Sequence, residues 1–172
     1  MDDVARLPSA DRAALFGETG AGRGVADTII EKDFWVCWSL KRLFGLPKGT
    51  TATLVFKGGT SLSKAFNAIR RFSEDIDLSF DRAELGYIGE RDPDKEGISK
   101  KQAARLIDDL VSDVEQHIAE KLLPALRAAI VGQLGEPTES EWSLEIDAGD
   151  AQTVNFHYPT ALPVAEYEGM TY

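Results

Sequence analysis

One stretch of this sequence carries the strongest indication of its fold. It runs Phe56-Lys57-Gly58-Gly59-Thr60-Ser61-Leu62-Ser63-Lys64 and continues, after residues 65–74, as Asp75-Ile76-Asp77-Leu78-Ser79-Phe80. The β-branched run Thr51–Phe56 predicts a strand, and the glycines that follow predict a turn. Ser61–Ala68 then reads as a short helix and Asp75–Phe80 as a second strand. This order predicts an α+β fold with a small mixed β-sheet flanked by helices.

The glycine turn has the composition of a phosphate-binding site. Gly58 and Gly59 have no side chains, so backbone N–H groups at this turn can approach phosphate oxygens closely. The helix that follows adds the partial positive charge of its N-terminus. Thr60 or Ser61 is placed to donate a hydroxyl hydrogen bond, so we expect a triphosphate to lie against these four residues.

Positive charge also clusters here. Lys57 precedes the turn, Lys64 lies one helical turn into the helix, and Arg70 and Arg71 follow, so each is placed to neutralise phosphate charge. A P-loop is excluded, because that motif needs four residues between its glycines and a final Gly-Lys-Ser/Thr.

Asp75 and Asp77 form a candidate metal site. At positions i and i+2 of a strand, both carboxylates and the Ser79 hydroxyl project from one face, while Ile76, Leu78 and Phe80 take the other. Two such carboxylates suit a pair of Mg²⁺ ions, which prefer oxygen ligands. A phosphate cradle with a metal-binding pair indicates transfer of a nucleotidyl group from a nucleoside triphosphate (NTP).

The rest of the chain frames this stretch within a single domain, residues 1–172. Residues 1–50 are expected to hold two helices. The first is Pro8–Phe16, capped by Ser9 and ended by the glycines at 17, 20, 22 and 24. The second is Thr28–Phe44, which begins with a Thr28/Glu31 capping box. Residues 51–80 hold the site. We expect a loop over Glu84–Gly97 and then a long helix over residues 99–131, capped by Ser99 and kinked or broken at Pro124. A hairpin over residues 141–158 is expected to follow it.

Composition and length limit the classes of function that this chain can have. The chain has 172 residues, 43% of them hydrophobic, and a net charge of −10. This length can bury one good core, and the acidic charge opposes non-specific nucleic-acid binding. The N-terminus lacks the pattern of a signal peptide, no apolar run approaches the ~20 residues that cross a bilayer, and Cys37 has no partner for a disulfide. We therefore expect a cytoplasmic protein with no membrane partner.

Other residues have both a functional and a plainer interpretation. Glu145 and Asp147 lie at i and i+2 of a predicted strand and offer a third carboxylate, but a solvated hairpin face is favoured. The remaining candidates are interpreted as structural or surface residues: the two histidines, the aromatic residues of the second helix and the basic start of the long helix, namely His117, His157, Phe34, Trp35, Trp38, Phe44, Lys100, Lys101 and Arg105.

Three blocks of the sequence resemble the AbiEii/AbiGii toxin family of nucleotidyltransferases. They are Glu31-Lys32-Asp33-Phe34-Trp35-Val36, the run from Phe56 to Lys64, and Arg71-Phe72-Ser73-Glu74-Asp75-Ile76-Asp77-Leu78. The resemblance implies the core of the DNA polymerase β-type nucleotidyltransferases. It also implies a toxin of a bacterial toxin–antitoxin or phage-defence system that transfers nucleotides from NTP, in some relatives to the acceptor end of tRNA.

The resemblance carries over residue by residue. Gly59 and Ser61 match the family's phosphate-binding motif, Asp75 and Asp77 match its metal-binding pair, and the accompanying positions are matched by Lys57, Arg71 and Ser73. Family members usually continue with a strand that bears an acidic residue and then a helical part with a lysine and an aspartate. Nothing after Tyr158 matches those blocks, so the family's C-terminal part is expected to be absent, and a third carboxylate to come from elsewhere.

The sequence thus predicts a Mg²⁺-dependent nucleotidyltransferase toxin. Its partners would be an NTP, possible RNA acceptors such as tRNA, and a cognate antitoxin. Two alternatives stay open: a catalytically incomplete module that binds NTP or an antitoxin, and an interaction domain in which the aspartate pair is surface decoration.

Overall fold

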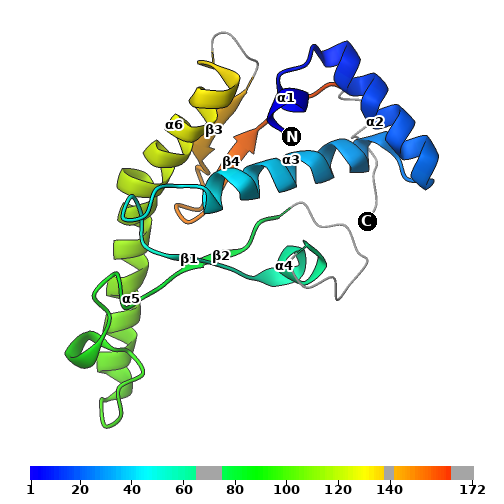
Figure 1. Cartoon of the computed structure of the whole chain (residues 1–172). Helices are drawn as coiled ribbons and strands as arrows, with labels where there is room; N and C mark the ends of the chain where they lie inside the picture. Colours follow the sequence, from blue (N-terminus) through cyan, green and yellow to red (C-terminus); the bar gives the residue numbers. More distant parts are fainter. Residues whose placement is uncertain (65–74, 138–141, 164–172) are drawn as a thin grey trace.

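A computed structural model describes residues 1–64, 75–137 and 142–163 of the chain (Figure 1). The predicted α+β class is confirmed. In chain order the elements are α1 (Asp2–Ala5), α2 (Ser9–Arg23), α3 (Asp27–Phe44), β1 (Leu54–Phe56), α4 (Gly58–Lys64), β2 (Leu78–Phe80), the 3-10 turn η1 (Gly89–Arg91), α5 (Lys100–His117), the π-helical turn η2 (Ile118–Leu122), α6 (Leu123–Leu134), β3 (Ser143–Ile146) and β4 (Val154–His157).

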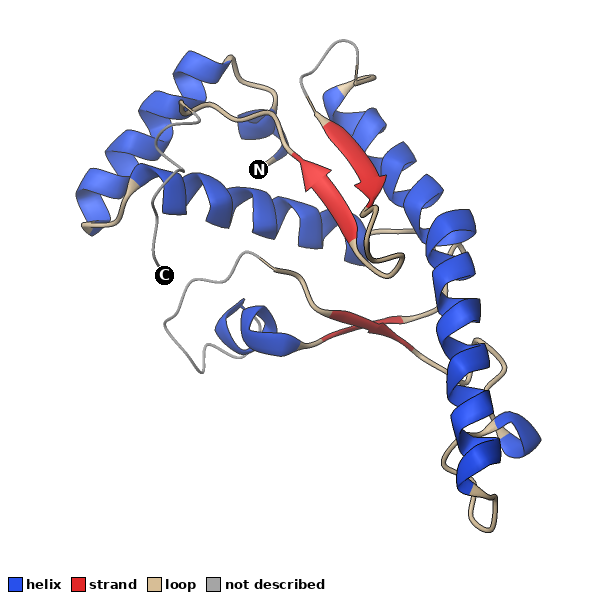
Figure 2. Ribbon diagram, turned by 180° about the vertical axis from the view of Figure 1, so that it is seen from behind, coloured by secondary structure: helices blue, strands red, loops and turns tan. Residues whose placement is uncertain are grey.

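The strands differ from the expected single mixed sheet. Among the described residues they form two antiparallel pairs, β1 with β2 and β3 with β4. In the views of Figures 1 and 2 the β1–β2 pair lies below α3 and the β3–β4 pair lies above it. The strands are also shorter than predicted, because β1 begins only at Leu54 and β2 only at Leu78.

The first predicted helix is longer than expected. α2 continues through Gly17, Gly20 and Gly22 and ends at Arg23, where Gly24 adopts a left-handed φ of 65°. Gly20 explains why a glycine is placed inside a helix, since a Cβ there would come within 2.7 Å of the Val25 carbonyl oxygen. Gly20 therefore allows close packing of α2 on the segment that leads into α3, and the helix ends only at Gly24.

α3 supplies the centre of the core, as its aromatic residues predicted. Trp35 and Trp38 are almost completely buried, and their rings lie 5.5 Å apart. The expected capping box does not open this helix, which begins at Asp27 after Ala26. Phe44 at its far end is half exposed, so the aromatic core stops short of the last turn.

The long second-half helix begins as predicted and changes register near Pro124. The Ser99 side chain accepts a hydrogen bond from the Gln102 backbone N–H at 3.2 Å. Pro124 lacks an N–H and crowds the carbonyl of Glu120, four residues earlier. The π-helical turn η2 contains that residue, so the helix continues as α6 instead of breaking. The buried cluster that contains Trp35 and Trp38 of α3 also includes Ile118, Leu122, Leu126 and Ile130.

The C-terminal part of the described chain packs back on α3. β3 and β4 form the predicted hairpin, and Phe156 stacks on Trp38 with ring centroids 5.9 Å apart. After β4, the backbone N–H groups of Ala161 and Leu162 donate to the Glu31 carboxylate at 2.7 and 3.3 Å. No helix among the described residues is long and apolar enough to span a membrane.

Candidate functional site

The glycine turn and Asp77 are packed directly together. The Lys57 backbone N–H donates to the Asp77 carbonyl at 2.8 Å, so pairing of β1 with β2 continues up to the turn. Gly58 then adopts a φ of 68°, and a Cβ built on it would lie 2.6 Å from the Asp77 Cγ and closer still to one carboxylate oxygen. Only glycine fits here, and its absent side chain brings the Asp77 carboxylate against the start of α4.

The two hydroxyls that were predicted to bind phosphate form hydrogen bonds within the turn region. The Thr60 hydroxyl donates to the Asp75 carbonyl, and the Thr60 side chain is completely buried. The Ser61 hydroxyl donates to the Gly58 carbonyl at 3.0 Å and is also buried. The assignment of Thr60 and Ser61 as phosphate ligands therefore stays a prediction. A Cβ on Gly59 would meet nothing within 4 Å, so there is open space on that side of the turn.

Asp75 and Asp77 both lie at the surface just before β2. Ile76, Leu78 and Phe80 pack against the core cluster, whereas Asp75 and Asp77 are exposed. Both residues precede β2 rather than lying within it, because β2 begins at Leu78. Their backbones are nevertheless held, Asp77 by Lys57 and Asp75 by the Thr60 hydroxyl.

The predicted cations have different surroundings. The Lys64 ammonium forms an ion pair with Asp33 on α3, and Lys57 is exposed. Cys37 lies near this pair, where burial raises the pKa of its thiol and keeps it protonated. Arg70, Arg71 and Ser73 lie outside the described residues, so their roles stay predictions.

A large cavity adjoins the aspartate pair. Its volume is about 950 Å³, and it lies between α3, the two strand pairs and the α5–α6 helix. Most of its wall is apolar, from Trp35 on α3 to Phe156 on β4. Polar groups join the wall where β2 begins and along α3, and its polar lining residues are Lys32, Ser39, Asp75, Asp77, Ser79, Arg82, Gln152, Thr153 and Asn155.

The aspartate pair fits Mg²⁺ better than a metal with an all-protein ligand shell. Within residues 1–64, 75–137 and 142–163, no three His, Cys, Asp or Glu side chains are grouped to hold a metal ion. Mg²⁺ does not require such a group, because it commonly binds through one or two carboxylates, substrate phosphates and retained water. Asp75 and Asp77, exposed beside an open glycine turn, provide that kind of site.

The two alternative carboxylates serve the β3–β4 hairpin. Asp147 accepts hydrogen bonds from the Gly149 N–H at 2.8 Å and the Asn155 side chain at 3.0 Å, which lowers the pKa of its carboxyl. Glu145 is exposed and lies 3.4 Å from His157. Their contacts agree with the plainer interpretation, a solvated hairpin.

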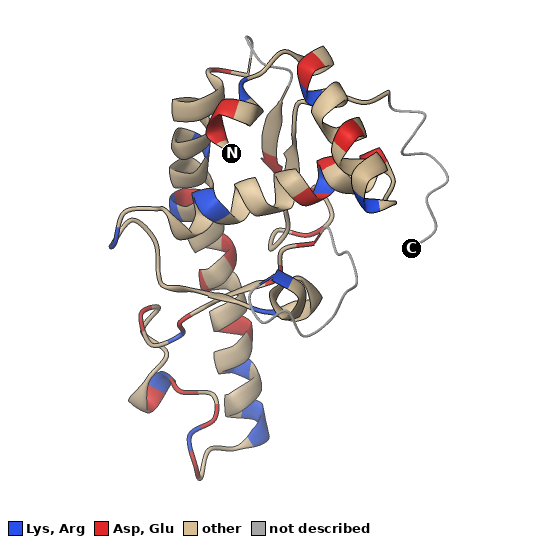
Figure 3. Cartoon of the chain, turned by 45° about the vertical axis from the view of Figure 1, so that its right-hand side comes forward, with Lys and Arg blue, Asp and Glu red and all other residues tan. Residues whose placement is uncertain are grey.

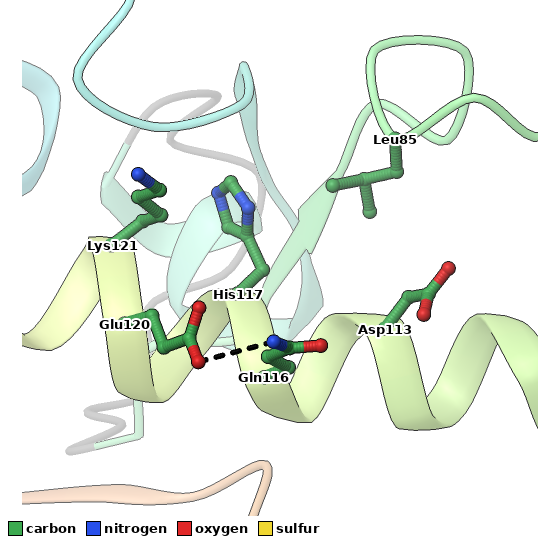
Figure 4. Close-up of a pocket in the computed structure, with 6 residues that line it drawn as sticks. All are labelled: Leu85, Asp113, Gln116, His117, Glu120 and Lys121. Carbon is green, nitrogen blue, oxygen red and sulfur yellow. Dashed lines mark hydrogen bonds between the residues drawn. The ribbon is translucent and has the colours of Figure 1, made fainter.

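His117 has a structural partner set, as expected. Its Nε2 accepts the Ala52 backbone N–H at 3.1 Å and lies 2.7 Å from the Thr51 hydroxyl, so it fastens the segment before β1 to α5. Burial lowers the pKa of this ring, which favours the neutral acceptor. It lines a pocket of about 220 Å³ together with Asp113 and Lys121 (Figure 4).

The basic start of α5 is solvated. Figure 3 shows lysine and arginine at the end of this helix that extends away from the α3 core, with acidic residues farther along it. Lys100, Lys101 and Arg105 are all exposed.

The candidate site thus consists of a glycine turn at a strand end, a helix that starts on it, Asp77 packed against the turn and the exposed Asp75. The comparisons place the chain among the nucleotidyltransferases. Residues 43–170 match the family described as nucleotidyl transferase AbiEii toxin, type IV toxin–antitoxin system, so the chain belongs to that family. Membership implies a nucleotide substrate and an antitoxin partner. No curated protein and no solved structure matched the chain.

Two α3 residues were missed as parts of the site's surroundings. Lys32 lines the cavity with Asp75 and Asp77, and Asp33 holds Lys64 of α4. The available signal was their place in the first block of the family resemblance.

Proposed function

We propose that this chain is a Mg²⁺-dependent nucleotidyltransferase that acts as a bacterial toxin and transfers a nucleoside monophosphate from NTP to an RNA acceptor such as tRNA. The observation that carries the proposal is the packing of the Asp77 carboxylate against the Gly58 turn. That contact joins a candidate phosphate-binding backbone to a candidate metal ligand within one small region. Residues 1–172 form one domain in this proposal, and its location is the cytoplasm, where NTP and tRNA are found.

The chemistry needs little more than positioning and charge. Mg²⁺ held by Asp75 and Asp77 would supply positive charge to the phosphate oxygens. The open backbone at Gly58 and Gly59 would orient the β- and γ-phosphates at the start of α4. A hydroxyl oxygen of the acceptor forms a bond to the α-phosphorus, the bond to the bridging oxygen breaks, and pyrophosphate leaves while the hydroxyl proton passes to solvent.

A non-catalytic NTP- or antitoxin-binding module is the second candidate. It is favoured by one observation, which is that the described residues group no third carboxylate with Asp75 and Asp77. A role in phage defence would be compatible with either candidate.

Substitution of Asp77 separates these functions. Asp77→Ala should abolish Mg²⁺-dependent labelling of an RNA pool by radiolabelled NTP and leave folding intact, because the side chain is exposed. Asp108→Ala, an exposed aspartate on α5, is the matched control and should keep full activity. Undiminished labelling by Asp77→Ala would refute the assignment. Binding of Mg²⁺-NTP with no labelling by the wild-type chain would favour the binding module.

A further inference from the structure

The two aspartates of the candidate site are held by different contacts. Asp77 belongs to the hydrogen-bonded ladder of the strand pair, because Phe56 pairs with Leu78 and the next bond joins the Lys57 N–H to the Asp77 carbonyl at 2.8 Å. Asp75 lies two residues farther out. Among the residues that the structure describes, no backbone–backbone hydrogen bond reaches it. The position of Asp75 relative to Asp77 therefore depends on another contact.

The Thr60 hydroxyl provides that contact. It donates to the Asp75 carbonyl oxygen, and the Thr60 side chain is completely buried. A hydroxyl has one hydrogen to donate, so the hydrogen of Thr60 is engaged with Asp75. Because no part of the side chain is exposed, water does not compete for this hydroxyl. Thr60 thus restrains the aspartate that the strand pairing does not reach.

One short segment contacts both aspartates. α4 begins at Gly58, whose missing side chain leaves room for the Asp77 carboxylate, and Thr60 lies two residues later in the same helix. Gly58 therefore contacts one aspartate and Thr60 the other. These two contacts from three consecutive residues fix how Asp75 and Asp77 stand relative to each other.

We propose that Thr60 is a positioning residue of the metal site, whose buried hydroxyl fixes the Asp75 main chain so that the carboxylates of Asp75 and Asp77 bind Mg²⁺ together. Mg²⁺ demands near-ideal octahedral geometry, so its affinity is sensitive to small shifts of a ligand. Groups that orient metal ligands without touching the metal typically contribute about 10–100-fold to metal affinity. Thr60 acts through Asp75 in this way. The inference rests on the proposed function, because it concerns the same aspartate pair.

The test compares two metals on the full chain, with inorganic tripolyphosphate as the phosphate ligand. Calorimetry measures the affinity for its Mg²⁺ complex and for its Ca²⁺ complex. Thr60→Val keeps the shape of the side chain and removes the O–H donor, so it should weaken binding of the Mg²⁺ complex about tenfold or more. Binding of the Ca²⁺ complex should weaken clearly less, because Ca²⁺ accepts flexible geometry. Thr60→Ser keeps the donor and should restore most of the affinity for the Mg²⁺ complex.

Thr51→Val is the matched control. The Thr51 hydroxyl lies 2.7 Å from the His117 Nε2, so this substitution removes a structural hydroxyl before β1 and leaves the contacts of the aspartate pair in place. It should bind both metal complexes like the wild type. Thermal unfolding followed by circular dichroism shows whether each variant is folded at the temperature of the titration. If Thr60→Val does not fold, Thr60→Ala replaces it under the same criteria, because it removes the donor without placing a methyl group at the Asp75 carbonyl.

Three results would overturn the role of Thr60. They are wild-type affinity for the Mg²⁺ complex in the variant without the donor, an equal loss for the Mg²⁺ and Ca²⁺ complexes, and the same loss in Thr51→Val. Asp77→Ala distinguishes these failures from failure of the proposed function. If Asp77→Ala loses binding of the Mg²⁺ complex and Thr60→Val does not, only the role of Thr60 is wrong. If Asp77→Ala binds normally, or the wild type does not bind, the proposed site is wrong as well.

Discussion

Replacement of Gly58 by alanine tests the contact on which the site depends. Gly58 has a φ of 68°, a conformation that costs an L-residue about 1–2 kcal/mol. The added Cβ would also lie 2.6 Å from the Asp77 Cγ and 2.8 Å from its Cβ, both closer than real Cβ atoms come to a neighbour. Asp77 cannot move aside freely, because its carbonyl accepts the Lys57 N–H at 2.8 Å.

The two effects together should cost more than the backbone strain alone. We expect Gly58→Ala to lower the free energy of unfolding by about 2 kcal/mol or more, which for a chain of this size lowers the unfolding temperature by about 4–8 °C. The added Cβ should also displace the Asp77 carboxylate, so the affinity for Mg²⁺-NTP should fall as well. Thermal unfolding followed by circular dichroism, and calorimetry with Mg²⁺-NTP, measure the two losses.

The chain contains two matched controls. Gly49 has a φ of 82° with nothing within 4 Å of an added Cβ, so Gly49→Ala reports backbone strain without a clash. Gly59 lies inside α4 with open space around it, so Gly59→Ala should raise stability by about 0.5–1 kcal/mol. The reasoning is refuted if Gly58→Ala behaves like Gly49→Ala and keeps NTP binding, because Asp77 would then not lie against the turn.

Two further predictions concern the parts that hold the site in place. Glu31→Gln should lower the free energy of unfolding by about 1–3 kcal/mol in chemical denaturation, because an amide N–H would then face one of two backbone N–H groups. Glu18 is exposed, so Glu18→Gln should change the free energy of unfolding little. The folded-state pKa of His117 lies below its usual 6.5, so its stabilising effect is full above that pH and is lost as protonation displaces the Ala52 N–H. As the pH is lowered from about 7.5 to 5.5, the unfolding temperature should fall in the wild type and in His157→Asn, and it should fall less in His117→Asn. Parallel curves of unfolding temperature against pH for the two variants would contradict this.

The structural features that follow from short-range rules were predictable from the sequence. The glycine pair, the aspartates at i and i+2 and the Ser99 cap each depend on residues at most a few positions apart, and alternation placed Ile76, Leu78 and Phe80 on the core side. The strand limits were overestimated at Thr51 and Asp75. Propensity marks residues that suit a strand, whereas pairing decides where one begins.

The errors occur where a distant residue determines the local structure. Gly20 reads as a helix breaker until Val25 and Asp27 are seen to pack against it, at which point it becomes a close-approach residue inside α2. Glu31 has the spacing of a capping box with Thr28, yet it accepts hydrogen bonds from Ala161 and Leu162, about 130 residues away. A single sequence gives no sign of such partners.

The same distinction explains how α3 organises the site. The glycine turn and the aspartate pair come from one short part of the chain, but a two-stranded pair has little stability by itself and needs a surface to pack on. Lys64 ties α4 to α3 through Asp33, and the alternate residues of β2 pack on the core that α3 centres. The α3 helix is in turn held by Glu31. A short motif can therefore specify which groups do the chemistry, while the geometry that makes them act together depends on a helix that begins about thirty residues before it.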